Sequence, residues 1–245
     1  MELRVFEKYP DLSIGAAAMM INYIERKPDA LLCFATGDSP KLAYQLVAET
    51  IKREGTDISK CFFIGLDEWL GISPDNTGSC HYFLQQYLFG PMGVESSQSC
   101  LFDAMTTNEE EECKKMNKII AERGGIDLMV AGIGMNGHIG FNEPGTDINS
   151  MAHVARLDEI TQEVGKKYFT EEVAISKGIT VGLKQVLQAK TLLMMASGKK
   201  KAPVIKRAVE EKTGTHWPAS LIQQHANGVL MIDTEAASEL VTQFR

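Results

Sequence analysis

Five short, mostly apolar runs recur along the chain, and a polar residue or a glycine follows each of them. They are Leu31–Ala35, Cys61–Leu66, Ile126–Ala131, Thr191–Ala196 and Gly228–Ile232. The residues between them show helical spacing: from Pro40 onward, Leu42 and Leu46 fall on one face. Short continuous apolar runs are typical of strands buried on both faces. Their alternation with helices predicts an α/β fold with a mostly parallel central sheet and helices on both faces.

The chain contains no Pro/Ser linker, low-complexity block or internal repeat, so we interpret residues 1–245 as one domain. In sheets of this kind, ligands bind beyond the carboxyl ends of the strands. The polar and glycine-rich segments of the chain directly follow the apolar runs. We therefore expect the functional residues to meet at that edge of the sheet.

Composition narrows the classes of function. The net charge of −7 disfavours nucleic acid as a partner. It does not exclude an anionic small substrate, because one local basic pocket suffices to bind it, and Lys199–Lys201 is the densest basic run. The five cysteines form no CxxC pair, which argues against a disulfide framework or a zinc site. No apolar stretch is long enough to span a membrane, and the first residues lack the layout of a signal peptide. We expect a cytoplasmic, reduced protein without a membrane partner.

The segment Thr36–Pro40 lies between an expected strand and an expected helix. Free N–H groups and a partial positive charge make a helix N-terminus suitable for binding phosphate, and Gly37 would let the backbone approach it closely. The alternative is a simple turn in which Asp38 or Ser39 caps the helix. The spacing of a Walker A loop is absent.

Two further polar segments follow strands. Asp67 and Glu68 end the second run, where a partly desolvated carboxylate would be a general base; the alternative is a loop acid or a helix cap. Ser197–Lys201 follows the fourth run, where a lysine would neutralise a phosphate; the alternative is a solvated lysine run.

The segment Gly132–Gly145 has the highest density of glycines and candidate catalytic side chains in the chain. It holds five glycines, two asparagines, His138 and Glu143 directly after a buried strand. An imidazole titrates near neutral pH and a carboxylate can orient it. The alternative is a structural glycine turn. A metal site is disfavoured because HExxH and a second nearby histidine are absent, and a GxGxxG dinucleotide motif would belong in a first βα turn.

Together these segments resemble the glucosamine-6-phosphate deaminase family, which includes galactosamine-6-phosphate deaminase/isomerases. The similarity covers nearly the whole chain, and "LDEW" followed by "GIGMNGHIGFNEPG" carries it, with support from "ATGDSP" and "SGKKKAPVIKRAVE". It implies a Rossmann-like α/β fold. It also implies conversion of an amino-sugar 6-phosphate to a ketose 6-phosphate (fructose or tagatose 6-phosphate) plus ammonia, without metal or cofactor.

The resemblance also implies roles for individual residues. His138 would open the sugar ring, with Glu143 and Asn136 orienting it, and Asp67 would move a proton between C2 and C1. Some family members have aspartate at the position of Asn136, so a charge relay through that position is in doubt.

The phosphate would contact Thr36, Gly37, Asp38 and Ser39, together with two lysines. Lys201 matches a family lysine, whereas Lys167 stands where the family usually has an arginine. Asp38 is a departure from the pattern, because an acid beside a phosphate repels it. The polar stretch Thr146–Phe169 is a candidate lid.

Three points stay open. Tryptophan after the acid pair and "FATGDSP" are more similar to the galactosamine branch, but the two sugars differ only at the C4 hydroxyl. A 6-phosphogluconolactonase-like hydrolase and a non-catalytic sugar-phosphate sensor are the alternative functions; the intact "GHIGFNEPG" with Asp67 disfavours the first, and the lack of a DNA-binding segment disfavours the second. The chain could be a monomer or a small homo-oligomer.

Overall fold

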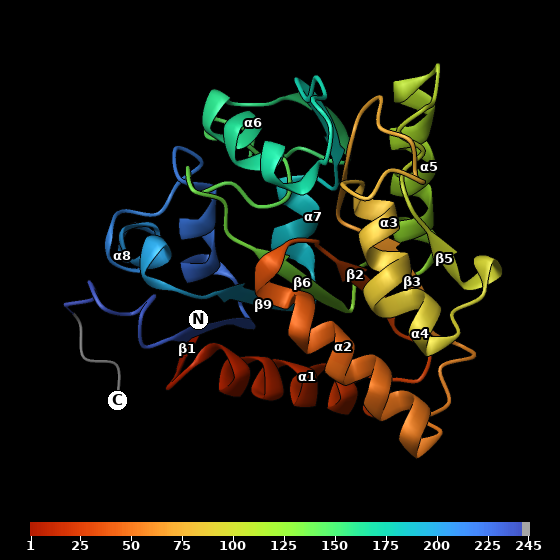
Figure 1. The fold of residues 1–245 in the computed structure, drawn as a ribbon, viewed down its shortest axis with the longest axis horizontal. Coiled ribbons are helices and arrows are strands. Elements are labelled where there is room, and N and C mark those ends of the chain that lie inside the picture. The colour runs from red at the N-terminus through yellow and green to blue at the C-terminus, as the bar shows by residue number, and fades with distance from the viewer. Residues whose placement is uncertain (242–245) are drawn as a thin grey trace.

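The computed structural model describes residues 1–241, and its main feature is a seven-stranded sheet (Figure 1). All neighbouring strands in this sheet run parallel. In spatial order the strands are β1 (Glu2–Phe6), β10 (Gly228–Asp233), β9 (Thr191–Ala196), β6 (Leu128–Gly132), β2 (Leu31–Phe34), β3 (Phe62–Gly65) and β5 (Ser99–Cys100). The predicted α/β fold with a mostly parallel central sheet is confirmed.

Helices cover both faces of this sheet. Along β2, Leu32 and Phe34 pack into one apolar cluster while Leu31 and Cys33 pack into another, which explains why the run is continuous. The first cluster contains residues of α1 (Tyr9–Arg26), α2 (Asp38–Glu54), α3 (Cys80–Leu84), η1 (Gln85–Phe89) and α4 (Gly90–Met92). The second contains residues of α5 (Glu109–Glu122), α7 (Leu183–Gln188), α8 (Ala202–Glu210) and η5 (Pro218–Gln224). No helix within residues 1–241 is long and apolar enough to cross a membrane.

A second, smaller sheet is antiparallel and has the order β4 (Asp67–Trp69), β8 (Lys177–Thr180), β7 (His153–Arg156). Only Leu66 separates β3 from β4, so the main chain passes from one sheet to the other within the run that we predicted as one strand. The interpretation of Asp67 and Glu68 as loop acids is therefore wrong, since both lie on a strand.

The structure differs from the sequence-based expectation in several boundaries. The helix expected from Pro40 begins at Asp38, and the strand expected from Ile126 begins at Leu128. The expected lid, Thr146–Phe169, contains β7 and then α6 (Glu159–Gly165) and η3 (Lys166–Tyr168). Figure 1 shows α6 on the side of the molecule opposite α1. Short 3-10 turns η2 (Ser96–Gln98) and η4 (Lys199–Lys201) complete the elements.

Candidate active site

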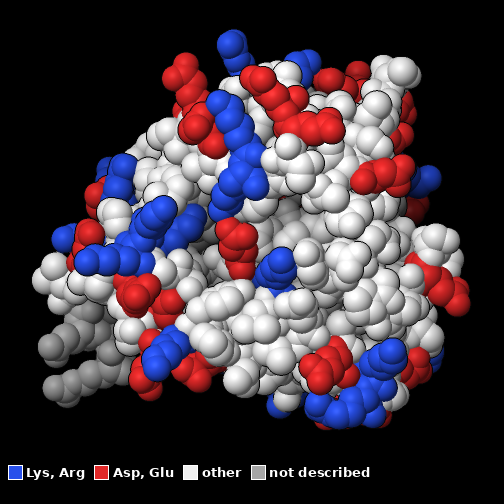
Figure 2. Space-filling view, in the orientation of Figure 1, with Lys and Arg blue, Asp and Glu red and all other residues white. Residues whose placement is uncertain are grey.

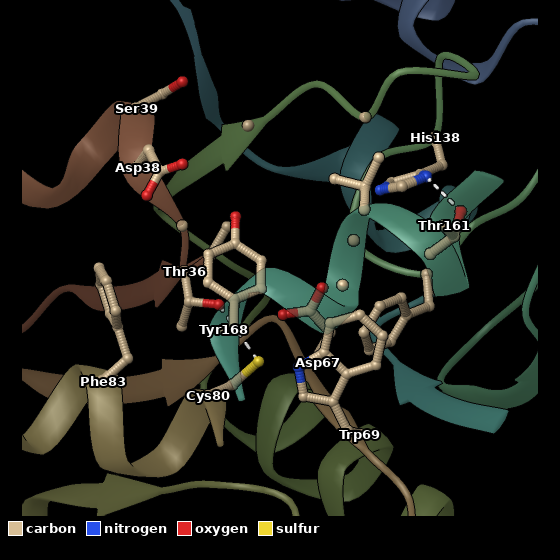
Figure 3. Close-up of a pocket in the computed structure, with 18 of the residues that line it drawn as sticks. Thr36, Asp38, Ser39, Asp67, Trp69, Cys80, Phe83, His138, Thr161 and Tyr168 are labelled. Carbon is tan, nitrogen blue, oxygen red and sulfur yellow. Dashed lines mark hydrogen bonds between the residues drawn. The ribbon is translucent and has the colours of Figure 1, made fainter. Parts of the chain in front are cut away.

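A pocket lies at the carboxyl-terminal edge of the large sheet, where the fold predicts a ligand site (Figure 3). Its walls come from six parts of the chain that are far apart in sequence. They are the turn after β2, strand β4, the start of α3, the loop after β6, the α6–η3 segment, and η4 with Lys201. The expected functional segments therefore do meet at one place.

The carboxylate of Asp67 faces this pocket (Figure 3). Its Oδ1 is shielded from bulk solvent and has no hydrogen-bond partner among residues 1–241. Burial, and then the neighbouring charge of Glu68, raises its pKa to about 7, while a hydrogen bond from the Cys80 thiol opposes the shift. A carboxylate in this state is suited to accepting a proton near neutral pH.

The adjacent carboxylate, Glu68, points elsewhere and is saturated with hydrogen bonds. It accepts from its neighbour Trp69 N (2.9 Å), from Ser79 Oγ (2.8 Å), and from Cys80 N and His81 N at the start of α3 (2.8 and 2.7 Å). Glu68 is only 2% exposed. The helix-cap interpretation therefore holds for Glu68, which ties β4 to α3, and only Asp67 is free to act on a ligand.

Replacing Glu68 with glutamine is expected to destabilise the fold. The amide would present an NH₂ group to Ser79 Oγ and the N–H of His81, so a buried donor would lose its acceptor, at a cost of about 2 kcal/mol. Urea unfolding monitored by circular dichroism measures this free energy. An unchanged unfolding midpoint would contradict the structural role of Glu68.

His138 belongs to a buried polar network with Asn136, Glu143 and Thr161. Its Nδ1 lies 2.7 Å from Asn136 Oδ1, 3.0 Å from Thr161 Oγ1 and 3.7 Å from Glu143 Oε2. The Asn136 amide donates through Nδ2 to Glu143 Oε2 at 2.7 Å, which leaves its Oδ1 as an acceptor. This arrangement places the imidazole proton on Nδ1, and Figure 3 shows the other ring nitrogen directed into the pocket.

Glu143 stands behind the imidazole and does not line the pocket. Burial acts to raise its pKa, but the hydrogen bond and charge of His138, with further hydrogen bonds from Thr161 and Asn136, outweigh burial and lower the pKa. Glu143 therefore remains a carboxylate that can stabilise a protonated imidazole.

Glycines let the loop after β6 fold tightly around His138. A Cβ on Gly134 would come within 2.2 Å of the His138 ring. Gly137 has a φ of +81°, and a Cβ there would come within 2.5 Å of Trp217. A side chain at either position would displace the imidazole or strain the backbone, which accounts for the glycine density.

The expected phosphate residues surround the start of α2. Gly37 has a φ of +114°, and the helix begins at the next residue. Lys201, from η4, lies on the same pocket wall; burial, and then the charge of Lys167, lowers its pKa to about 8. Thr36, whose hydroxyl donates to Cys80 Sγ at 3.2 Å, and Ser39 also line the pocket. The arrangement concentrates positive potential and free N–H groups at one end of the cavity.

Asp38 and Lys167 form an ion pair at this end of the pocket, with Lys167 Nζ 2.6 Å from Asp38 Oδ2. Both side chains are at least half exposed. Figure 2 shows basic and acidic groups side by side over the region between α6 and the start of α2. The ion pair explains how an acid is tolerated beside the residues that we expect to bind phosphate.

Comparison with known proteins identifies the family. Residues 12–231 match the sequence profile of the family described as glucosamine-6-phosphate isomerases/6-phosphogluconolactonase. The chain belongs to this family.

Relatives within this family cover the full length of the chain. A glucosamine-6-phosphate deaminase of Clostridium botulinum (strain Loch Maree / Type A3) is 36% identical over 241 residues, which is 98% of this chain and 99% of the relative. The putative deaminase AgaI of Escherichia coli (strain K12) is 36% identical over 232 residues, which is 95% of this chain and 92% of the relative.

Solved structures of the family agree on the fold. A monomeric glucosamine-6-phosphate deaminase has a TM-score of 0.93 and 32% identity, covering 98% of this chain and all of that one. The 6-phosphogluconolactonase from Trypanosoma brucei has a TM-score of 0.79 at 17% identity, with 98% of each chain covered, and shares the fold alone.

The structure adds pocket residues that the sequence did not reveal. Thr161 and Tyr168 come from the α6–η3 segment, and Cys80 and Phe83 come from α3 (Figure 3). None belongs to a glycine-rich turn or follows an apolar run, so nothing in their spacing indicated a site. Within the described part of the chain, no group of three or more His, Cys, Asp or Glu side chains is arranged to hold a metal ion.

Proposed function

We propose that this chain is an amino-sugar 6-phosphate deaminase that converts glucosamine 6-phosphate or galactosamine 6-phosphate to fructose or tagatose 6-phosphate and ammonia. One observation carries the proposal: Asp67, whose Oδ1 has no hydrogen-bond partner among residues 1–241, and His138, with a free ring nitrogen, face the same pocket beside a cationic helix start. The chemistry requires two bases acting on different atoms and a site for the phosphate. The related deaminases support this choice of substrate class.

Ring opening comes first, because the closed sugar hides its carbonyl. His138 Nε2 removes the proton of the anomeric hydroxyl, the bond between C1 and the ring oxygen breaks, and that oxygen takes up a proton. The imidazolium formed in between is stabilised through Nδ1–H by Asn136, with the Glu143 carboxylate 3.7 Å away. An asparagine is sufficient at position 136 because its role is to orient the His138 ring through hydrogen bonds. The negative charge that stabilises the imidazolium comes from Glu143.

Proton transfer between carbons follows. The C1 aldehyde acidifies the C2 proton, and Asp67 removes it while O1 takes up a proton, which gives an enolamine. Asp67 then returns its proton to C1 as the amino nitrogen gives one up, and the product is a C2 imine of the ketose. Water then replaces the imine nitrogen, which releases ammonia. Each positioned proton transfer contributes about 10²–10⁴-fold to the rate. Phosphate binding at the start of α2 and at Lys201 holds the sugar, so binding energy at one end aligns the reacting carbons at the other.

An assay with both substrates tests the proposal. The purified protein is incubated separately with glucosamine 6-phosphate and galactosamine 6-phosphate, and ammonia and ketose phosphate are measured; the ratio of kcat/KM then assigns the sugar. Trp69 lines the pocket after the acid pair, as in the galactosamine branch, whereas related deaminases carry the glucosamine name, so both epimers are needed. If neither sugar is turned over, the proposal is wrong. Hydrolysis of 6-phosphogluconolactone would instead support the lactonase alternative, a reaction in which no base removes a proton from carbon.

The Asp38–Lys167 ion pair leads to a prediction about KM. Asp38→Asn is expected to lower KM by about two- to fivefold at low salt and to leave kcat nearly unchanged, because an exposed ion pair worth about 0.2–1 kcal/mol no longer competes with the phosphate for Lys167. Steady-state kinetics measure both constants. Asp11→Asn, which removes an equivalent charge in the first turn of α1, is the control. A large loss of kcat would show that Asp38 has another role.

A further inference from the structure

The hydroxyl of Thr161 reaches the network of His138 from a different part of the chain. Thr161 is 3% exposed, and its Oγ1 lies 3.0 Å from His138 Nδ1 and 3.4 Å from Asn136 Nδ2. The N–H of Asp158, at the start of the same helix, donates to Glu143 Oε1 at 3.2 Å. Helix α6 therefore docks on the loop after β6 through the polar groups that orient the imidazole.

The other end of the same segment meets the phosphate cradle. Lys167, six residues after Thr161, pairs with Asp38 at the start of α2. The Tyr168 hydroxyl lies close to Gly37, at 3.4 Å from where a Cβ would be. Figure 3 shows the Tyr168 hydroxyl directed toward the side of the cavity that holds Asp38, and Thr161 beside His138. One short stretch of chain thus contacts both functional ends of the pocket.

Close packing makes this stretch a single unit. A Cβ on Gly165, between the two ends, would come within 2.7 Å of the ring of Trp69, so the helix is seated directly on β4. Packed elements transmit a shift rather than absorb it. We therefore expect a displacement at Lys167 to shift Thr161.

We infer that Thr161 is a positioning residue for His138, and that it ties the orientation of the imidazole to the phosphate-facing end of the α6–η3 segment. The inference rests on the proposed function for its catalytic consequence. The hydroxyl accepts from the imidazole Nδ1–H or the Asn136 amide while its own proton is available to Glu143, so it closes the network around the imidazole. A residue that only filled space would not need the hydroxyl.

Thr161→Val removes the hydroxyl at nearly constant volume, and Thr161→Ser keeps it. The ring ¹⁵N shifts of His138, measured by NMR on the ligand-free proteins, are expected to show the Nδ1–H form in the wild type and in the serine variant. In the valine variant the Asn136 amide loses one of the two acceptors that hold its Oδ1 toward Nδ1, so a mixture of tautomers is expected. With substrate, kcat of the valine variant is expected to fall about tenfold or more while KM changes less than about threefold, and serine restores most of kcat. Wild-type shifts and kcat in the valine variant would overturn the inference.

A titration with inorganic phosphate tests the link between the two ends. In the wild type, phosphate is expected to move the His138 ring signals as it occupies the cradle, and in Thr161→Val it is expected to bind without moving them. Identical responses in both proteins would refute the link. If neither sugar phosphate is turned over, the proposed function fails, yet the shifts of the ligand-free proteins still decide the role of Thr161. A folded amide spectrum of the valine variant, compared with that of the serine variant, separates a local effect from unfolding.

Discussion

Asp67→Asn is expected to lower kcat for deamination by about 10²–10⁴-fold, with KM nearly unchanged. Asparagine fits the same space and cannot accept the C2 proton. Ammonia release measures the loss, and exchange of the C2 hydrogen in D₂O isolates the step, because ring opening still proceeds in this variant while carbon-bound exchange stops. Exchange at the wild-type rate would show that another group removes the proton.

The raised pKa of Asp67 adds a pH dependence. The carboxylate must be ionised to act, so wild-type kcat/KM is expected to fall as the pH drops below about 7. Stability runs the opposite way: the folded pKa lies above the unfolded value of 3.8, so stability is full below that value and declines as the pH rises toward about 7. Asp67→Asn is therefore expected to unfold at a higher temperature than the wild type at pH 8, whereas Glu68→Gln unfolds at a lower one.

His138→Gln is expected to lower kcat by a similar factor, about 10²–10⁴-fold, because the closed ring then opens only at its uncatalysed rate. Glutamine retains a hydrogen-bonding side chain of comparable reach and does not titrate. Steady-state ammonia release measures kcat. Binding of an open-chain amino-hexitol 6-phosphate, followed by calorimetry, is the control, since this ligand needs no ring opening and its affinity should be retained.

The two variants fail at different steps, and that difference can be checked. Any open-chain substrate that reaches His138→Gln should still exchange its C2 hydrogen through Asp67. A double variant that keeps substantial activity would contradict the assignment of both residues.

The sequence predicted the fold class and the edge of the sheet that holds the site. The run Leu31–Ala35 is buried on both faces of the sheet, so every residue in it is apolar and the strand can be recognised from the sequence. The turn after β2 and the loop after β6 were found because glycine marks backbone geometry that other residues avoid. Resemblance, rather than spacing, singled out Asp67 over Glu68. The structure shows a physical difference between them: Asp67 has one carboxylate oxygen without a partner among residues 1–241, whereas Glu68 accepts four hydrogen bonds.

The second sheet was not predicted, and α6 was expected only as part of the candidate lid Thr146–Phe169, with no role for Thr161. Strands β7 and β8 are short, and β7 is largely half-exposed, so neither leaves a continuous apolar run. Thr161 lies in a polar helix of seven residues and meets His138 only through tertiary packing across 23 positions of the chain. A contact between residues so far apart in the chain depends on how the helix packs against the loop, and the spacing of residues within either segment does not reveal it.

The passage from β3 to β4 has a consequence for how such a pocket diversifies. Leu66 is fixed on both sides, since its N–H donates to Phe34 O at 2.9 Å and its carbonyl accepts from Val181 N at 2.9 Å. Asp67 therefore follows a residue that hydrogen bonds hold in place on both sides. Phe83 and Tyr168, which also line the pocket, lie on other elements, α3 and η3. Substitutions at Phe83 or Tyr168 are therefore expected to change the shape of the pocket wall without moving Asp67, so related chains can differ in the ligand that they admit while the carboxylate keeps its position.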